Sequence, residues 1–151
     1  MKILPPMNMR RRWSRILGVK GGMDTDKRYD MVLERELTDR IIGACVEVSR
    51  TLGVGFLESV YHKALLVEFD NLKINYSSQS KLPVSYKGVT VGDFMADVIV
   101  EKKVILELKV ATSIVNEMKA QLMNYLKASG IKIGYVINFG NPKLEWKRIV
   151  L

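Results

Sequence analysis

Two apolar runs with charged residues at matched positions constrain the fold of this chain most strongly. Residues 96–100 are apolar except for Asp97, and residues 104–110 are apolar except for Glu107 and Lys109. The polar residues 101–103 between them suit a short turn. Two strand-like runs separated by such a turn predict a β-hairpin.

The register of this hairpin decides where the charged side chains point. Side chains alternate between the two faces of a strand, so Glu107 and Lys109 share one face. If the hairpin is symmetric about Lys102, Asp97 lies opposite Glu107 on that same face. Two carboxylates directly opposite each other repel and destabilise a sheet. We therefore expect Lys109, a cation, or both to neutralise them, and carboxylates with water are typical ligands of Mg²⁺.

An ordinary explanation competes with the metal site. In a lysine-rich chain, a Glu-x-Lys element on a strand is usually a cross-strand charge pair on a solvated face. Against this, apolar residues occupy both faces of the strand: Val104, Leu106, Leu108 and Val110 on one, Ile105 on the other. Such runs indicate strands covered on both sides, where a charge must be paired or metal-bound. The hairpin alone leaves both interpretations open.

Length and composition limit the classes of protein to which this chain can belong. A chain of 151 residues is long enough for one domain with a real core. No apolar run approaches the roughly 20 residues that span a bilayer, so we expect a cytoplasmic protein without a membrane segment. The single Cys45 excludes an internal disulfide and a cysteine-based zinc cluster and is expected in the core. The lone His62 cannot form a histidine-rich metal site by itself.

The net charge of +8 is concentrated near the N-terminus. Residues 1–29 hold eight basic and two acidic residues, a balance of +6, which leaves +2 for the remainder. This segment contains Pro5-Pro6 and Gly21-Gly22, and we predict a disordered basic tail over residues 1–29 and a single domain over residues 30–151. Its apolar part is too short and interrupted for a signal peptide. Met7, Met9, Met23 and Met31 are alternative candidates for the translation start.

Apolar periodicity and turn residues predict an α/β (α+β) domain with a mixed sheet flanked by helices. Thr112-Ser113 would cap the last helix and Gly130 would end it. The expected helices are residues 34–52, 57–71 and 114–128, and the expected strands are residues 73–76, 82–86, 89–100, 103–110, 132–139 and 144–151.

Two further motifs lie on the predicted helices. Gly55, Glu58 and Tyr61 open the second helix, where Glu58 and Tyr61 share a face. Gln121 and Tyr125 lie four residues apart on one face of the last helix. Either pair alone is ordinary, because a glutamate or glutamine on a solvated helix face and a half-buried tyrosine are common.

Taken in order, these motifs resemble a known group of enzymes. The set Gly-x-x-Glu-x-x-Tyr, Asp, Glu-x-Lys and Gln-x-x-x-Tyr is similar to the PD-(D/E)xK nuclease superfamily, and more closely to the bacterial GxxExxY protein family. The resemblance runs over residues 34–151 and includes residues 121–126 and 137–140.

The resemblance implies a metal-dependent nuclease core that hydrolyses phosphodiester bonds in DNA or RNA. It implies that Asp97, Glu107 and Glu58 hold Mg²⁺ or Mn²⁺, and that Lys109 orients the attacking water and stabilises charge on the phosphate. The residues implied to position the site or the nucleic-acid backbone are Gln121, Tyr125 and Tyr61. A bound metal would supply what this hydrolysis needs, a water that is nucleophilic at neutral pH and charge neutralisation.

Two other interpretations remain. The chain could be a nucleic-acid-binding or partner-binding module on a nuclease fold with weak or no catalysis. It could also be a toxin, phage or mobile-element accessory protein. The retained Asp97, Glu107 and Lys109 favour the enzyme, and convergence of Glu58 with these three residues in one place is the observation that would discriminate.

Overall fold

A computed structural model describes residues 25–151 of the chain. It contains three helices in that range, α2 (Thr25–Leu52), α3 (Glu58–Asn71) and α4 (Asn116–Ser129). Its strands are β1 (Tyr76–Tyr86), β2 (Val89–Val100), β3 (Val104–Lys109), β4 (Ile133–Asn138) and β5 (Glu145–Val150). The chain divides into one unit up to Arg40 and a second from Ile41 to Leu151, and the second holds all five strands.

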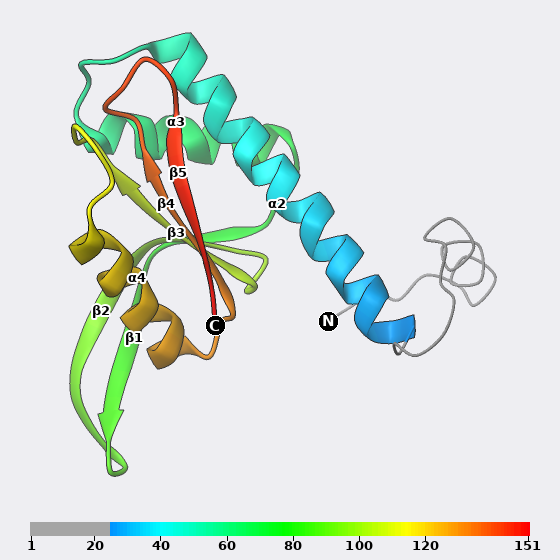
Figure 1. Cartoon of the computed structure of the whole chain (residues 1–151), viewed down its shortest axis with the longest axis vertical. Coiled ribbons are helices and arrows are strands. Elements are labelled where there is room, and N and C mark those ends of the chain that lie inside the picture. The colour runs from blue at the N-terminus through cyan, green and yellow to red at the C-terminus, as the bar shows by residue number, and fades with distance from the viewer. Residues whose placement is uncertain (1–24) are drawn as a thin grey trace. The chain divides into compact units, whose positions relative to one another are not determined.

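The five strands form one mixed sheet in the order β1-β2-β3-β4-β5 (Figure 1). β3 and β4 are parallel and the other three pairs are antiparallel. The parallel pair requires a crossover, and α4 supplies it between β3 and β4. This is the α+β architecture with a mixed sheet and flanking helices that the sequence pattern predicts.

The β2–β3 hairpin has the register expected from the sequence. Val98 pairs with Leu106, Ile99 with Ile105 and Val100 with Val104. The turn closes with a hydrogen bond of 2.9 Å from the N–H of Lys103 to the carbonyl of Val100. Glu101 and Lys102 have φ of 51° and 56°, and positive φ at both central positions is typical of the turns that match strand twist. Continuing the register by one step places Asp97 opposite Glu107.

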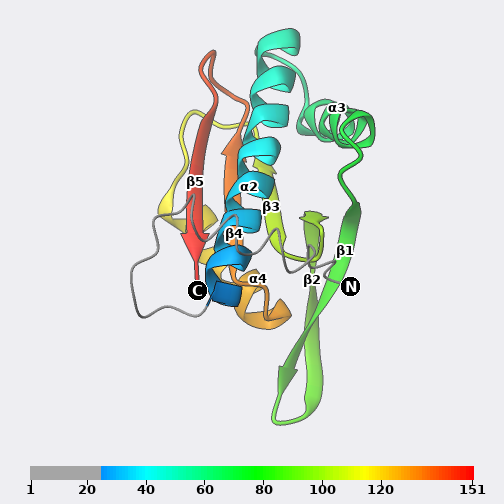
Figure 2. The same cartoon turned by 90° about the vertical axis from the view of Figure 1, so that its right-hand side faces the viewer.

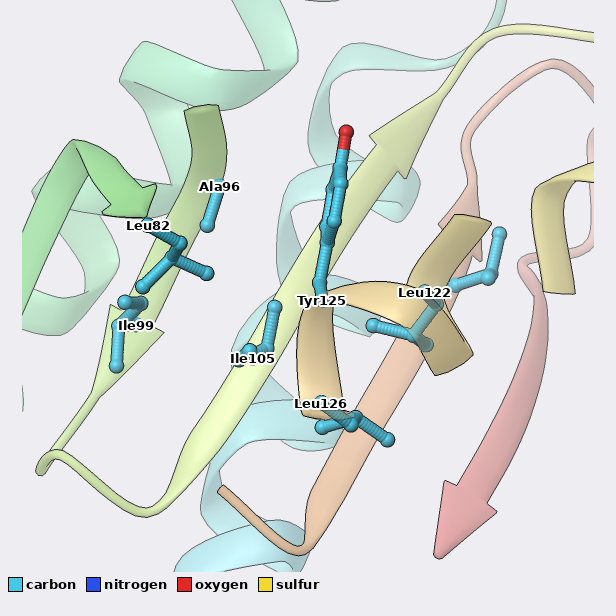
Figure 3. Packing of buried hydrophobic residues seen from close by; sticks show 8 residues of the cluster. Leu82, Ala96, Ile99, Ile105, Leu122, Tyr125 and Leu126 are labelled. Carbon is cyan, nitrogen blue, oxygen red and sulfur yellow. The ribbon is translucent and has the colours of Figure 1, made fainter. Parts of the chain in front are cut away.

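Helices cover both faces of the sheet. Figure 2 shows α4 on one side of the strands, and the part of α2 that belongs to the second unit, from Ile41 onward, on the other. α3 lies at the end where β3 and β4 finish (Figure 1). On the α4 side, a Cβ on Gly134 would come within 2.7 Å of the Leu122 side chain, so glycine permits this close approach. The apolar cluster on this side consists of Leu82, Ala96, Ile99, Ile105, Leu122, Tyr125, Leu126 and Val136 (Figure 3).

The other face of the central strands is also buried. Val104, Leu106 and Leu108 of β3 have no exposed surface, and Phe139, just after β4, stacks on Tyr61 of α3 with ring centroids 4.9 Å apart. Cys45 is fully buried, as the sequence predicts. The strand that carries Glu107 and Lys109, β3, is thus covered on both faces, which removes the solvated-face explanation for Glu107.

Several element boundaries differ from the expectation. The predicted strand over residues 73–76 is wrong except at Tyr76, where β1 begins. β1 then runs without a break through the predicted strand over residues 82–86, because the polar serines between the two predicted strands still pair with β2. Thr112-Ser113 does not cap α4: its N-cap is Val115, without a side-chain hydrogen bond. The Glu145 carboxylate accepts from the N–H of Ile114 and the Asn141 side chain donates to the carbonyl of Thr112, so long-range contacts hold this segment outside the helix. Gly130 does end the helix, with φ of 74°.

The first helix begins earlier than predicted. It starts at Thr25 rather than near residue 34, so residues 25–29 of the predicted tail are helical. Residues 25–42 contain no proline or glycine that would end the helix. The helix therefore extends toward the N-terminus beyond the apolar residues from which its start was predicted. The rest of the predicted disordered tail, residues 1–24, lies outside the described residues. No helix in residues 25–151 has the length and apolarity needed to cross a membrane.

Candidate active site

The carboxyl groups of Asp97 and Glu107 meet across the β2–β3 pair. The N–H of Leu108 donates a hydrogen bond of 2.7 Å to Oδ2 of Asp97, and the N–H of Asp97 donates one of 3.3 Å to Oε1 of Glu107. Each carboxylate therefore reaches the backbone of the opposite strand. The side chains are also close enough for a hydrogen bond between the two carboxyl groups. The sheet register brings together the two acidic residues that the sequence singled out.

Glu107 is a buried acid with a strongly shifted pKa. The residue is only 4% exposed. Burial, followed by the negative charge of Asp97, raises the pKa of Glu107 to about 8. The positive charge of Lys109 and the hydrogen bond from the Asp97 N–H oppose this rise. At neutral pH the pair thus retains a proton unless a further positive charge replaces it.

Lys109 influences the pair without forming a close ion pair with it. Its positive charge lowers the pKa of both Glu107 and Glu58. Within residues 25–151, however, no ion pair joins Lys109 to any of the three acidic residues Asp97, Glu107 and Glu58. Lysine alone therefore does not neutralise the two carboxylates.

Glu58 reaches the same place from the start of α3. It is the first residue of the helix. Burial, followed by the negative charge of Asp97, raises the pKa of Glu58, and a hydrogen bond from the Val110 N–H opposes the rise. Val110 directly follows β3, so Glu58 lies at the end of the strand that carries Glu107 and Lys109. Glu58 thus lies close enough for the charges of Asp97 and Lys109 to change its pKa.

Tyr125 approaches the carboxylates from α4. Burial raises the pKa of its hydroxyl, and the negative charges of Glu107 and Asp97 raise it further. Figure 3 shows the ring beside β3, with the hydroxyl directed toward the end at which that strand finishes. Gln121, one turn earlier on α4, is exposed. The Gln-x-x-x-Tyr motif thus places its tyrosine beside the carboxylates and its glutamine at the surface.

Tyr61 is buried, and its hydroxyl forms hydrogen bonds with the backbone of the loop before α3. Its hydroxyl donates a hydrogen bond of 2.6 Å to the carbonyl of Gly53 and accepts one of 3.3 Å from the N–H of Phe56. The side chain is fully buried. Gly55 has φ of +106°, a conformation that residues with a Cβ rarely adopt. Gly55 and Tyr61 therefore shape the loop that leads into α3, whose first residue is Glu58.

His62 is a residue that sequence reasoning set aside. Its Nε2 lies 2.9 Å from Oγ of Ser78 on β1, and its charge helps to lower the pKa of Glu58. His62 follows Glu58 by four residues, so both lie on one helix face. That spacing was visible in the sequence, but the contact with β1 was not.

The donor set can hold one small divalent cation only with help from water. Among the described residues, no three His, Cys, Asp or Glu side chains are gathered closely enough to hold an ion. Mg²⁺ is usually held by one or two carboxylates and several waters. Asp97 and Glu107 supply two adjacent carboxyl groups that lack a close cationic partner among residues 25–151. The chemistry of this pair fits such an ion.

Comparisons with known proteins agree with the fold and with the resemblance to the nuclease superfamily. A family model of the PD-(D/E)XK nuclease superfamily matches residues 35–149. The crystal structure of SSO0001 is similar with a TM-score of 0.50 and 19% sequence identity, over 61% of this chain. This chain spans 48% of the length of that chain. Because the sequence identity is only 19%, the likeness concerns the fold alone. No curated protein matches significantly. Because the family match covers most of its length, this chain belongs to the PD-(D/E)XK nuclease superfamily.

Proposed function

We propose that this protein is a Mg²⁺- or Mn²⁺-dependent nuclease that hydrolyses phosphodiester bonds in DNA or RNA. The observation that carries the proposal is the pair formed by the half-buried Asp97 and the buried Glu107. Their two carboxyl groups lie together, and Lys109 follows Glu107 by two residues on β3. Membership of the superfamily supports a nucleic-acid substrate. We further propose that the chain belongs to the GxxExxY family, because Gly55 and Tyr61 shape the loop that leads into α3, and Glu58 begins that helix near this pair.

The carboxylates would hold the ion. Asp97 and Glu107 would bind it directly, and Glu58 would contact one of its waters, because no third carboxylate among the described residues is close enough to bind the ion directly. When bound, the ion would lower the pKa of a coordinated water and stabilise negative charge on the phosphate. Loss of the shared proton from the carboxyl pair would accompany binding, because the ligand form of a carboxylate is the ionised one.

The remaining residues would act on water and phosphate. Lys109 is a cation and cannot bind the metal, so its ammonium group would orient the attacking water and stabilise charge that develops on the phosphate. Tyr125 would donate its hydroxyl hydrogen bond near the carboxyl pair, and Gln121 would contact the nucleic-acid backbone from the surface of α4. Tyr61 would act through the loop that places Glu58.

A cleavage assay tests the proposal. The full chain is incubated with Mg²⁺ or Mn²⁺ and a panel of single-stranded, duplex and branched DNA and RNA. We expect cleavage of at least one substrate, loss of cleavage with chelator, and loss in Glu107→Gln, which removes the charge but keeps the side-chain volume. Glu117→Gln is the matched control, because Glu117 is exposed at the start of α4.

Two results would replace this proposal. Binding of one of the nucleic acids without any cleavage would favour a binding module on a nuclease fold. Equal cleavage by the wild type and Glu107→Gln would show that the carboxyl pair does not act in catalysis.

A further inference from the structure

A buried hydrogen-bond network begins where β3 ends. Asn138, the last residue of β4, is fully buried. Its Oδ1 accepts a hydrogen bond of 2.9 Å from the N–H of Ala111, and its Nδ2 donates one of 2.9 Å to the carbonyl of the same residue. Oδ1 also accepts from the N–H of Gly140 at 3.0 Å. The side-chain amide thus pairs with both backbone groups of Ala111, as a neighbouring strand would.

Glu145 extends this network toward α4. Its Oε2 accepts a hydrogen bond of 3.1 Å from Nδ2 of Asn138, and its Oε1 accepts one of 3.1 Å from the N–H of Ile114. Glu145 is the first residue of β5 and pairs with Asn138 in the sheet. One carboxylate therefore connects the end of β4 with the backbone just before α4. We call Asn138, Glu145 and the backbone groups they bind the Asn138 network.

Backbone packing tightens the same junction. A Cβ on Gly140 would lie 2.1 Å from the carbonyl oxygen of Ala111, which no side chain could tolerate without a backbone shift. The N–H of Phe139 donates a hydrogen bond of 2.8 Å to the carbonyl of Lys109. The backbone from Lys109 to Ala111 is therefore fixed by three consecutive residues, 138 to 140.

This backbone carries two groups of the candidate active site. Lys109 supplies the ammonium group, and the N–H of Val110 binds the Glu58 carboxylate. Lys109 carries the first of the two anchored carbonyls, and Val110 lies between it and the second, that of Ala111. Lys109 is the last residue of β3, so a displacement of this segment would move the end of that strand, with Lys109 and Val110, relative to Asp97 on β2 and to Glu107 farther back on β3.

We propose that Asn138 and Glu145 are positioning residues for the phosphodiester site, and that they act by fixing the backbone that carries Lys109 and Val110. The expected effect on kcat rests on the proposed nuclease function. The expected displacement of Lys109 and Val110 can be measured without cleavage. A misplacement of about 1 Å in a catalytic group can cost about 10²-fold in rate. The network is thus expected to affect kcat more than KM.

Glu145 is the better position to test, because it is only partly buried whereas Asn138 is fully buried. Glu145→Ala removes both acceptors. Glu145→Gln keeps an oxygen for the N–H of Ile114 but offers an NH₂ group where Asn138 needs an acceptor. Glu117→Ala removes an exposed carboxylate of α4 and is the control. Thermal melting verifies that each variant is folded at the assay temperature.

The first measurement is NMR of the full-length chain without substrate. We expect Glu145→Ala to shift the Lys109 side-chain and Val110 amide signals beyond the changes seen in Glu117→Ala, and to speed amide exchange at Ala111 and Ile114. Glu145→Gln is expected to give intermediate effects. Faster exchange at Ile114 alone, with Lys109 and Val110 signals unchanged, would overturn the inference, because the network would then hold only the start of α4.

The second measurement applies to any substrate that the wild type cleaves. We expect Glu145→Ala to lower kcat about 10-fold or more with KM changed less than about 2-fold, and Glu145→Gln to recover part of the loss. A rise in KM with unchanged kcat would contradict a positioning role. If the wild type cleaves nothing, the nuclease proposal fails while the NMR result still decides whether the network positions Lys109.

Discussion

The backbone amide of Asp97 binds the carboxylate of Glu107, and the two carboxyl groups lie within hydrogen-bonding reach of each other. This arrangement is costly in a protein without bound cation. Two like charges at such separation disfavour ionisation of both, and Glu107 is also withdrawn from water. A stable sheet does not require this pair, and buried groups with strongly shifted pKa values cluster at functional sites.

The pair makes the stability of the metal-free protein depend on pH. The pKa of Glu107 is about 8 in the folded protein, against an ordinary value of 4.5. The folded state therefore keeps a proton that the unfolded chain releases, so stability falls as pH rises from about 5 to about 8. Thermal melts in chelator across this range measure the effect. Glu107→Gln should remove most of the slope, and Asp97→Asn should reduce it partly, since burial is the larger cause.

A slope that stays the same in Glu107→Gln would assign the pH dependence to another group. Glu58 is the first to examine, because its pKa is also raised, by burial and by Asp97. The Glu58→Gln variant separates the two contributions.

Divalent metal should stabilise the protein through the same carboxylates. An ion that binds only the folded state adds about 2.7 kcal/mol at a free concentration 100 times its Kd. We expect Mg²⁺ or Mn²⁺ to raise the melting temperature of the wild type, more strongly at pH 8 than at pH 6, because protons compete for Glu107. Asp97→Ala should abolish the rise. It should also stabilise the metal-free protein above about pH 8, where Glu107 is ionised and the substitution removes one of two repelling charges.

A wild-type melting temperature that does not respond to millimolar Mg²⁺ or Mn²⁺ at pH 8 would contradict a site on this pair. Calorimetric titration would then show whether any binding occurs elsewhere, and Asp93→Ala is a useful control because Asp93 is an exposed acid on the same strand.

The central part of the fold follows from local sequence signals. The charged residues within two apolar runs, with a polar turn between them, sufficed to predict the β2–β3 register that brings Asp97 opposite Glu107. Because side chains alternate between the two faces of a strand, the sequence spacing determines which of them share a face. A short hairpin turn leaves little freedom in register. The end of α4 was also predictable, because Gly130 tolerates the left-handed conformation found there.

The remaining parts depend on contacts between distant residues. Thr112-Ser113 has the composition of a helix cap, but Glu145 and Asn141, about 30 residues later, bind this segment instead. Two other hydrogen bonds likewise depend on the path of the chain. They join Tyr61 to the carbonyl of Gly53 and His62 to Ser78. A single sequence contains no direct signal for such pairs, although a lone asparagine in the apolar strand β4 marks Asn138 as unusual.

The loop before α3 provides a third prediction. Tyr61→Phe removes the hydroxyl that links Gly53 with Phe56 but keeps the stacking on Phe139. Leaving these backbone groups unsatisfied should cost about 1–3 kcal/mol. Chemical denaturation measures the loss. We expect metal affinity to fall only slightly, because Glu58 is a secondary contact. Tyr86→Phe, an exposed tyrosine at the tip of the β1–β2 hairpin, is the control.

A Tyr61→Phe variant that is as stable as the wild type would show that water replaces the hydroxyl in this loop. A variant that is stable yet loses nucleic-acid binding would instead indicate that Tyr61 contacts the substrate.

Lys109→Ala provides the test that separates catalysis from metal binding. Asp97 and Glu107 are anionic and can hold an ion, whereas Lys109 is cationic and can act only on water or phosphate. Removing one preorganised group that stabilises transition-state charge typically costs about 10²–10³-fold in kcat. We therefore expect Lys109→Ala to lower kcat by about that factor with little change in KM, which is the pattern of an interaction made mainly in the transition state.

Metal affinity must be measured in the same variant, because Lys109 lowers the pKa of Glu107. Without this lysine, Glu107 holds its proton more tightly, which weakens metal binding near neutral pH, while the repulsion between Lys109 and the ion is also lost. These two effects oppose each other, so we expect a small net change in Kd. Lys102→Ala, in the exposed turn of the same hairpin, controls for the loss of one positive charge. Cleavage by Lys109→Ala at the wild-type rate would show that Lys109 only tunes the charge of its neighbours, and the catalytic assignment would then rest on the carboxylates alone.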